Sequence, residues 1–576
     1  MGKSLGYLVP ALRSGRRVVV TTATKALQDQ LADKDLPFLE EHLGSDFDWA
    51  VLKGRSNYLC LQRLREQQSA KAGQLDLEDV SPITRAEIAK LATWSGTTAS
   101  GDQAELDWAP SVAAWTAVSV SSEECPGAQR CPVGSACFAE LARAKAQATD
   151  LIVVNTHLYG LHVASNGVLL PEHDVVVVDE AHQLEDIMSD TVGVSITPGR
   201  VVRTAAAVRR VLEDPEILAK LLDTAPSLRD VLAGRVGERL GRPLPDPIAD
   251  ALNEVRDRCD RALDALRSIS TTVEDVKQKV LRAQQLAGRL MEHIDIAIAH
   301  NESAVAFVSG SAEHPELEVA PLDVGPVLRE GVWTKCTAIL TSATMPQGLA
   351  GRVGLPDDGV TELSVDSPFD HEHHGLIYCA MSLPDVRNQD YSARMHEELA
   401  ALIEAAGGRT LALFTSYRAM QAAADAVAPR IPQKVMTQRD LPKSALVAEF
   451  TSSESTCLFA TAGFFQGVDI PGRTLSLVTI DRLPFPRPDD PLLSARRERL
   501  GANAFGIIDL PRASMLLAQA AGRLIRTRTD RGVVAVFDRR LGTAPYRWQL
   551  VNALPPMKRT RHREEAEAFL REITSE

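Results

Sequence analysis

Apolar residues along this chain gather in short runs, each followed by polar residues and often by a stretch with helical spacing. Residues 16–31, RRVVVTTATKALQDQL, show this unit clearly, with Thr24 placed to cap the helix. Residues 148–160 and 173–184 repeat the buried run, and the second of these, HDVVVVDEAHQL, carries four consecutive valines. Such runs are typical of strands in a parallel sheet that is covered on both faces. The pattern predicts an α/β fold whose polar strand ends are placed to bind ligands.

The pattern of apolar and charged residues changes between residues 195 and 300, where charged residues alternate with apolar ones at helical spacing. We interpret this stretch as a helical insertion. The strand pattern returns in residues 332–345, VWTKCTAILTSATM, and a second α/β set begins near residue 370. Its predicted strands lie in residues 409–417, 455–472, 474–485 and 531–540.

Length and charge narrow the class of protein. A chain of 576 residues is too long for a single core, so several domains are expected. The net charge of -13 excludes a surface that is basic throughout, although a local basic channel can exist in an acidic protein. The sequence contains no apolar run long enough to span a bilayer, and we expect a cytoplasmic protein.

The cysteines fall into two groups. Four are scattered singly and are interpreted as small buried apolar residues: Cys259, Cys336, Cys379 and Cys457. The other four comprise Cys60 in LKGRSNYLC and a triplet in ECPGAQRCPVGSACF, formed by Cys125, Cys131 and Cys137. In a cytoplasmic chain such a group indicates metal or cluster ligation instead of disulfides. The group lacks the C-x-x-C pairs typical of zinc, so the spacing leans towards an iron–sulfur cluster while zinc stays open.

Several polar residues together fit a nucleoside triphosphate site. Gly2, Lys3 and Ser4 precede an apolar run, as at the end of a phosphate-binding loop, where a lysine meets the phosphates and a hydroxyl meets magnesium. Asp179 and Glu180 end the valine strand, where one acid can hold magnesium and the other can orient the attacking water.

Residues 519–527, QAAGRLIRT, offer the arginines that a transferred phosphoryl group needs. Arg523 and Arg526 are three positions apart, so on a helix they share a face. Gln519 precedes them by one turn. Two arginines at this spacing usually lie on a solvated helix face. They support a nucleotide site here only because the acids and the lysine occur elsewhere in the same chain.

These motifs together resemble the XPD/DinG-type superfamily-two helicases, the iron–sulfur DNA helicases. The matching stretches run almost from end to end: GKS, TTATKALQDQL, LKGRSNYLC with the cysteine triplet, VVVVDEAH, LTSATM, FFQGVDIPG, LPFPRPDDP and QAAGRLIRT. DEAH and QxxGRxxR occur in many helicases, whereas the four cysteines between the phosphate loop and DEAH separate this branch from the others. The resemblance implies two RecA-like parallel-sheet motor domains with an iron–sulfur insertion and a helical arch insertion.

The resemblance also implies a role for each matching residue. Lys3 and Ser4 match the nucleotide lysine and the magnesium hydroxyl, and Gly2 the loop before them. Asp179 and Glu180 match the magnesium and water-activating acids. The remaining nucleotide-site and coupling residues are His182, Ser342 and Thr344 of the first domain's motifs, and Gly467, Asp469, Gln519, Arg523 and Arg526 of the second domain. The ligands of a 4Fe–4S cluster would be Cys60, Cys125, Cys131 and Cys137.

The implied domains follow the order of the motifs. They are residues 1–54, 146–194 and 331–365 for the first motor domain, 55–145 for the iron–sulfur insertion, 195–330 for the arch, and 366–576 for the second motor domain. The implied activity is ATP-dependent DNA unwinding with Mg²⁺, 5′ to 3′ along single-stranded DNA, in DNA repair or replication. We expect a monomer that contacts single-stranded or forked DNA through hydroxyls and arginines of both α/β domains.

The chain departs from the family pattern at two places. Phe465 and Gln466 stand where tryptophan and glutamate are frequent, although Gly467 and Asp469 remain. The larger departure is the opening, because the family has a strand and a full glycine-rich loop before the lysine. Two explanations stay open: either the sequence starts too late, or the chain is a fragment and a poor ATPase. We favour the first, because the arginine and alanine content indicates a GC-rich genome, in which GTG codons are frequent.

The second explanation leads to an alternative function. The chain would then be an ATP-independent iron–sulfur protein that binds single strands or a repair partner. A helicase acting on RNA is a lesser alternative, because nothing in the sequence is suited to recognising the 2′-hydroxyl.

Overall fold

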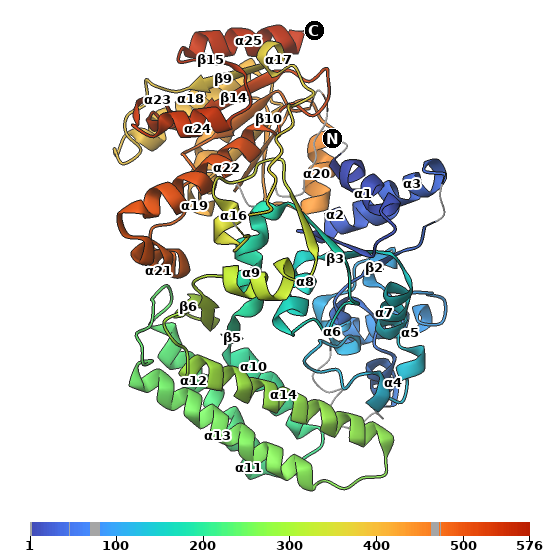
Figure 1. The fold of residues 1–576 in the computed structure, drawn as a ribbon. Coiled ribbons are helices and arrows are strands. Elements are labelled where there is room, and N and C mark those ends of the chain that lie inside the picture. Colours follow the sequence, from blue (N-terminus) through green and yellow to red (C-terminus); the bar gives the residue numbers. More distant parts are fainter. Residues whose placement is uncertain are drawn as a thin grey trace. The chain divides into compact units, whose positions relative to one another are not determined.

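Both predicted parallel sheets are present in a computed structural model that describes residues 3–44, 47–69, 81–356, 358–461, 472 and 474–575. The chain forms two compact units, which are drawn in Figure 1. Unit 1 contains residues 1–341, 350–358 and 489–495, and unit 2 contains residues 342–349, 359–488 and 496–576. Three short segments, residues 342–349, 350–358 and 489–495, therefore belong to a different unit from the segments on either side of them.

The sheet of unit 1 has five parallel strands in the order β2-β3-β1-β4-β8. Its strands are β1 (Val18–Thr22), β2 (Trp49–Leu52), β3 (Leu151–Asn155), β4 (Val175–Asp179) and β8 (Thr337–Thr341). Strands β1 and β4 are buried along their whole length, as their valine runs predict. Strand β8 lies at the end of this order and is much more accessible, with Ile339 41% exposed. Among the described strands, β8 pairs only with β4.

Helices cover this sheet and connect its strands: α1 (Lys3–Arg13), α2 (Lys25–Gln30), α3 (Leu36–His42), α8 (Thr156–Ala164), α9 (Leu184–Val192), α15 (Gly325–Leu328) and α16 (Leu349–Arg352). The predicted cap is confirmed, because the Thr24 hydroxyl accepts a hydrogen bond from the Leu27 amide. Tyr7, Leu8 and Ala11 of α1 pack against β1 and β4 in one apolar core. That packing holds the first helix, with Lys3 at its start, against the sheet.

The segment that carries the four clustered cysteines has a small core of its own. It contains α4 (Leu61–Ser69), α5 (Pro82–Trp94), α6 (Val112–Val118) and α7 (Phe138–Ala148). Leu91, Trp115 and Phe138 are buried in this core. Gly134 permits the tight loop between two of the cysteines, because a Cβ there would lie 2.1 Å from the Ala128 carbonyl oxygen. We call residues 55–145 the cysteine module.

The predicted helical insertion is present as α10 (Pro198–Arg209), α11 (Pro215–Leu222), α12 (Thr224–Ala233), α13 (Asp246–Ser268) and α14 (Glu274–Ile298). The structure adds an antiparallel sheet that the sequence analysis did not predict, with β5 (Val194–Ile196), β6 (Ala304–Gly310) and β7 (Pro315–Pro321) in the order β5-β7-β6. The helices and this sheet bury one continuous apolar core. Leu252 and Val255 of α13 and Leu290 of α14 lie within it.

The sheet of unit 2 has seven parallel strands in the order β11-β12-β10-β13-β14-β9-β15. Its strands are β9 (Gly375–Cys379), β10 (Thr410–Phe414), β11 (Lys434–Thr437), β12 (Thr456–Thr461), β13 (Leu477–Ile480), β14 (Gly532–Val536) and β15 (Lys558–Thr560). The predicted strands correspond to β10, β12, β13 and β14, and the other three were missed. β11 and β15 are short and contain charged residues, so their hydrophobic signal is weak, whereas β9 is apolar and as long as β10.

Helices lie on both faces of the second sheet and give it two separate cores. They are α17 (His371–His374), α18 (Tyr391–Ala405), α19 (Tyr417–Val427), α20 (Lys443–Thr451), α21 (Pro491–Leu500), α22 (Leu510–Ala521), α23 (Arg540–Thr543), α24 (Arg547–Ala553) and α25 (Arg563–Ser575). The first residues of α21 belong to unit 1. Of the scattered cysteines, Cys259 and Cys457 are buried, as predicted, whereas Cys336 and Cys379 are half-buried.

Candidate functional site

The acidic pair of unit 1 lies at the carboxyl end of the central part of its sheet. Strand β4 ends at Asp179, and Glu180 follows it in the left-handed region at a φ of 55°. A non-glycine residue in this region is uncommon and often marks a functional turn. The turn is closed locally, because the Glu180 amide donates to Asp179 Oδ1 at 2.8 Å. Both carboxyl groups are thereby held at the strand end.

Lys3 brings its ammonium group to these two acids. Its Nζ lies 2.6 Å from Asp179 Oδ1 and 2.5 Å from Glu180 Oε1. Tyr7, one turn along the same helix, donates from its hydroxyl to Asp179 Oδ2 at 3.2 Å. Ser4, between them, is half-buried, and Gly2 lies outside the described residues. The structure therefore brings Lys3 together with Asp179 and Glu180.

The charges at this position are strongly coupled. Burial by itself raises the pKa of Glu180, but the hydrogen bond with His182 and the charge of Lys3 outweigh it and lower the pKa to about 2. Burial lowers the pKa of Lys3, and the charges of Glu180 and Asp179 outweigh that effect and raise it. His182 Nδ1 lies 3.3 Å from Glu180 Oε2. At neutral pH both Glu180 and Lys3 are ionised, so the site presents oxygens for a divalent cation and an ammonium group for an anion.

Of the residues expected in the second motor domain, Gln519, Arg523 and Arg526 lie in unit 2. Ser342 and Thr344, which were expected from the first domain's motifs, lie in unit 2 as well. Gln519 Nε2 donates to Thr344 Oγ1 at 3.2 Å, which joins the QAAGRLIRT segment to the SAT segment within that unit. The Ser342 hydroxyl in turn accepts from the Thr344 amide at 3.2 Å. Gly467 and Asp469 lie outside the described residues, as do Phe465 and Gln466.

One prediction about these residues is wrong. Arg523 and Arg526 do not share a face of a helix, because α22 ends at Ala521 and Gly522 caps it. The Arg523 amide donates instead to the Ala520 carbonyl at 3.2 Å, and the Arg526 amide to Asp530 Oδ2 at 2.8 Å. Glycine often ends helices, so Gly522 is a stop signal that the helical prediction did not take into account. Both arginines therefore lie on the irregular segment after the helix.

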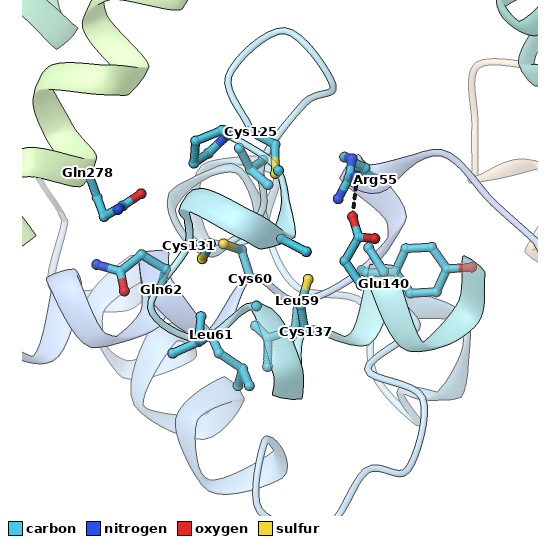
Figure 2. A pocket seen from close by; sticks show the side chains of 18 of the residues that line it. Arg55, Leu59, Cys60, Leu61, Gln62, Cys125, Cys131, Cys137, Glu140 and Gln278 are labelled. Carbon is cyan, nitrogen blue, oxygen red and sulfur yellow. Dashed lines mark hydrogen bonds and ion pairs between the residues drawn. The ribbon is translucent and has the colours of Figure 1, made fainter. Parts of the chain in front are cut away.

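The four clustered cysteines line one pocket of unit 1. Cys60 precedes α4, Cys137 precedes α7, and Cys125 and Cys131 lie on the loop between α6 and α7. Figure 2 shows their side chains around the pocket, with Gln278 entering from a different helix. The structure thus brings together all four residues that the sequence grouped, although Cys60 is separated from Cys125 by more than sixty positions.

Charged and polar groups surround these thiols. The Arg55 guanidinium, which lines the pocket, pairs with Glu140. Burial raises the pKa of the Cys60 thiol to about 11, against an opposing hydrogen bond from the Arg63 backbone. Burial also raises the pKa of Cys131. The thiols of Cys60 and Cys131 are therefore protonated at neutral pH, and a bound metal or cluster must displace their protons.

Two buried N–H donors, one in the lining of the pocket and one close to Cys60 in sequence, have no hydrogen-bond partner among the described residues. Buried side-chain atoms without a hydrogen-bond partner in the described structure include Arg63 Nε and Arg282 Nε. Arg282 lines the pocket and Arg63 follows Cys60 by three positions. Buried N–H groups without a partner are rare in proteins. Four thiols with N–H donors among and beside them fit a group whose sulfur atoms accept hydrogen bonds.

Sequence analysis missed the part of the pocket that comes from the helical insertion. Gln278 and Arg282 of α14 both line it, although they lie more than 140 positions after the last clustered cysteine. The available signal was weak: polar residues recur at the spacing of one helix face, which is usually solvated. Only the folded chain shows that this face is buried.

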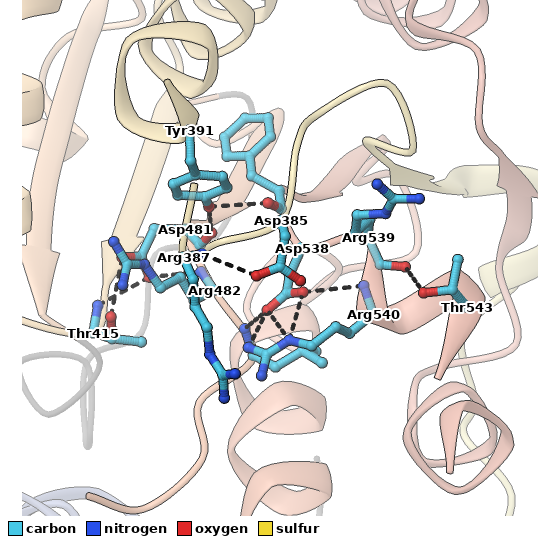
Figure 3. A network of polar contacts seen from close by, with 12 residues as sticks. Asp385, Arg387, Tyr391, Thr415, Asp481, Arg482, Asp538, Arg539, Arg540 and Thr543 are labelled. Atoms are coloured by element: carbon cyan, nitrogen blue, oxygen red, sulfur yellow. Dashed lines mark hydrogen bonds and ion pairs between the residues drawn. The ribbon is translucent and has the colours of Figure 1, made fainter. Parts of the chain in front are cut away.

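A second polar network lies at the carboxyl ends of three strands of unit 2 (Figure 3). Asp481 follows β13 and accepts hydrogen bonds from the Thr415 amide at 3.0 Å, the Thr415 hydroxyl at 3.1 Å and the Arg482 amide at 2.8 Å. Asp538 follows β14 and pairs with Arg540, whose Nη2 lies 2.6 Å from it. Burial raises the pKa of Asp481 to about 7, although the hydrogen bonds from Thr415 and Arg482 act the other way.

These two carboxylates are buried, whereas the guanidinium groups around them are more accessible. Asp481 is 2% exposed and Asp538 is fully buried. Arg387 is exposed, and Arg539 is half-buried. The buried acids therefore fix the strand-end loops, and the charge that solvent meets beside them comes largely from arginines.

Comparisons with known proteins give consistent relatives over nearly the whole chain. The ATP-dependent helicase DinG of Mycobacterium tuberculosis is 39% identical over 616 aligned positions, which cover 99% of this chain and 91% of the relative. The ATP-dependent DNA helicase YoaA of Escherichia coli is 34% identical, with the same two coverages. A helicase C-terminal domain family matches residues 399–557. These relatives do not favour the ATP-independent alternative.

Solved structures agree on the fold. An XPD helicase superposes with a TM-score of 0.60 at 16% identity, covering 97% of this chain and 94% of that chain. At that identity the likeness concerns the fold alone, and it supports the predicted α/β architecture with parallel-sheet motor domains. Among the residues that the structure describes, no helix is long and apolar enough to cross a membrane.

Proposed function

The chain belongs to the DinG/YoaA family of ATP-dependent helicases, and we propose that it unwinds DNA by moving 5′ to 3′ along a single strand. As an ATP-dependent helicase it uses ATP with Mg²⁺. The observation that best supports a working nucleotide site is the contact of Lys3 with Asp179 and Glu180 at the end of β4. A role in DNA repair or replication is consistent with this activity.

In this proposal each residue of the acidic site has one task. Asp179 holds the hydrated Mg²⁺, with the Ser4 hydroxyl as a further ligand, and Lys3 binds the phosphates. Glu180, kept ionised by its surroundings, orients and deprotonates the attacking water. His182 links Glu180 to the rest of the domain through their 3.3 Å contact. Gly467, Asp469, Gln519, Arg523 and Arg526 keep the roles that the family resemblance implies.

We further propose that Cys60, Cys125, Cys131 and Cys137 hold a 4Fe–4S cluster. Within the described residues, no three His, Cys, Asp or Glu side chains are grouped closely enough for a single metal ion. Around one tetrahedral zinc the sulfur atoms would lie only about 3.8 Å apart, given Zn–S bonds of about 2.3 Å. A cluster spreads its irons and therefore suits thiols that surround a common but wider pocket. When bound, the cluster would supply a rigid centre that ties distant segments together.

The domain division proposed from the sequence remains our working division. The cysteine module and the helical insertion, residues 195–330, have separate apolar cores, which supports treating them as separate insertions into the first motor domain. For DNA we propose contacts to phosphates through the accessible arginines beside Asp481 and Asp538, including Arg387 and Arg539. The protein is proposed to act as a monomer in the cytoplasm.

Strand displacement tests this function directly. The purified protein is given a duplex with either a 5′ or a 3′ single-stranded tail, with Mg²⁺ and either ATP or a non-hydrolysable analogue. We expect ATP-dependent displacement of the labelled strand from the 5′-tailed duplex. Displacement from the 3′-tailed duplex alone would contradict the direction, and strand binding without displacement would contradict the motor function.

A further inference from the structure

Helix α14 of the helical insertion has two faces with different partners. Ala283, Ala287 and Leu290 face the apolar core of the insertion. The polar residues of the other face recur at intervals of three, four and three positions and form one stripe: Asp275, Gln278, Arg282 and Gln285. All four contact the cysteine module. We call them the α14 stripe.

The contacts of the α14 stripe reach both parts of the cysteine module. Asp275 accepts a hydrogen bond from Gln62 at 2.9 Å. Gln278 donates to the Arg130 carbonyl, and Gln285 donates to the Cys125 carbonyl at 3.4 Å. The stripe therefore spans α4, which begins directly after Cys60, and the loop that carries Cys125 and Cys131.

Arg282 lies at the centre of this stripe. Its two terminal nitrogens each donate to one oxygen of Glu66 at 2.9 Å, a bidentate pair in which both side chains are only 6% exposed. Its Nε is buried without a hydrogen-bond partner among the described residues, and the side chain lines the pocket that contains the four cysteines. The pair with Glu66 fixes the guanidinium group, and one N–H donor is left over.

We propose that Arg282 is a positioning residue for the cluster, and that the cluster in turn holds the α14 stripe against the cysteine module. This inference rests on the 4Fe–4S cluster proposed above. Cluster and thiolates together carry net negative charge, and a fixed guanidinium group beside them offsets that charge. An N–H donor to a ligand sulfur also shifts the reduction potential of a cluster.

The coupling works in both directions for the same physical reason. Without the cluster, the loop of Cys125 and Cys131 loses the bonds that define its shape, and the two carbonyls that Gln278 and Gln285 bind are no longer held. The buried Nε–H of Arg282 then has no acceptor, which is costly in a low-dielectric site. Water entry at the stripe relieves this cost, so α14 detaches when the cluster is lost.

The first test uses the unaltered protein. Hydrogen exchange is measured across α4 and α14 in the iron-loaded protein and after removal of iron by a chelator under reducing conditions. We expect exchange of residues 274–286 to rise about ten-fold or more on iron loss, while the distant part of α13 is unchanged. Equal protection of α14 in both forms would overturn the coupling.

The second test uses Arg282→Gln and Arg282→Lys, with Arg289→Gln as the matched control. Arg289 lies on the same helix, is exposed and pairs with Glu292. We expect Arg282→Gln to lose iron to the chelator about ten-fold faster. The equilibrium between the oxidised and reduced cluster in this variant should shift about ten-fold towards the oxidised form. That shift lowers the reduction potential by about 59 mV for a one-electron reduction. For both iron loss and reduction potential, Arg282→Lys should lie between Arg282→Gln and the wild type, and Arg289→Gln should match the wild type.

The outcomes separate the two proposals. Wild-type protein without iron would refute the cluster itself, whereas iron-loaded wild type with an unchanged potential in Arg282→Gln would refute only the role of Arg282. Poor folding of Arg282→Gln is recognised by exchange in the core of the insertion. In that event Glu66→Gln, which leaves the guanidinium group in place but removes its clamp, replaces it. Iron should again be lost to the chelator faster, whereas removal of the negative charge of Glu66 should shift the reduction equilibrium towards the reduced form.

Discussion

Lys3 Nζ donates to Glu180 Oε1 at 2.5 Å and so joins residues 177 positions apart in the chain. The contact spans the entire cysteine module, which is inserted between the first helix and β4. Its basis is the packing of α1 on the sheet, through Tyr7 and Leu8, which brings the start of the helix to the strand end. Residues from the two ends of this segment can therefore form one nucleotide site.

The first prediction concerns Glu180→Gln. We expect ATP binding to persist, because Lys3 and Asp179 remain, and turnover to fall about 100-fold or more with loss of the base. Phosphate release with single-stranded DNA measures turnover, and a fluorescent ATP analogue measures binding. Asp174→Asn at the exposed amino end of the same strand is the control. A wild-type rate of phosphate release in Glu180→Gln would contradict the assignment.

The second prediction concerns Cys125→Ser. Because a serine oxygen is a poor ligand for a cluster, the variant should lose iron and visible absorbance, and unwinding should fall more than ATP hydrolysis. Metal analysis after anaerobic purification, together with absorbance, checks this. Cys379→Ser, at a half-buried cysteine of unit 2, should keep its iron. Stoichiometric zinc without iron in the wild type would assign the pocket to zinc instead.

The third prediction concerns Arg526→Ala. Its guanidinium group is proposed to offset charge on the transferred phosphoryl group, so the variant should fold normally and hydrolyse ATP at least about ten-fold more slowly. Steady-state hydrolysis with circular dichroism as a folding check measures both. Arg528→Ala, two positions on and exposed, should hydrolyse ATP like the wild type. If both variants are equally active, Arg526 has no catalytic role.

The sequence was sufficient for features that depend on local patterns. The valine run of β4 and the acids that end it predicted both the strand and the position of Asp179, because buried parallel strands leave a strong hydrophobic signal. The four cysteines that were grouped from the sequence also line one pocket of the folded chain. By contrast, the helical spacing of Arg523 and Arg526 misled, because Gly522 ends the helix between Gln519 and these arginines.

Contacts between residues far apart in the sequence could not be predicted from local patterns. Nothing in the local sequence of α14 distinguishes Arg282, which is buried against Glu66, from Arg289, which faces solvent. The difference depends on which helix face meets the cysteine module, and that follows from packing over more than 200 positions of sequence separation. Similarly, the polar strand β15 is defined by its pairing with β9 and not by its composition.

The fourth prediction concerns DNA binding by unit 2. Arg539→Gln should weaken binding of single-stranded DNA at low salt and reduce the slope of log affinity against log salt by about one, because one phosphate contact is lost. Fluorescence anisotropy across a salt series measures both quantities. Arg571→Gln on α25, where Arg571 pairs with Glu567, is the control for a general change of charge. An unchanged salt slope in Arg539→Gln would exclude a phosphate contact at this position.

The fifth prediction concerns pH and Asp481. Its pKa is raised from the ordinary 3.8 to about 7, mainly by burial, so the folded state keeps a proton that the unfolded state releases between these values. Stability from this group is therefore complete below about pH 4 and is lost as pH rises through 7. Between pH 5 and pH 8 the loss should be about 3 kcal/mol.

Asp481→Asn should remove this part of the pH dependence. The variant loses hydrogen bonds at every pH, but its stability relative to the wild type should improve steadily from pH 5 to pH 8, because asparagine cannot ionise. Hydrogen exchange in peptides of β10 and β13, corrected for intrinsic pH effects, follows unit 2 specifically. Asp440→Asn is the control, because Asp440 accepts the same kinds of bond from Thr437 but is exposed. Parallel pH profiles for Asp481→Asn and the wild type would show that Asp481 is already ionised in the folded protein at pH 5.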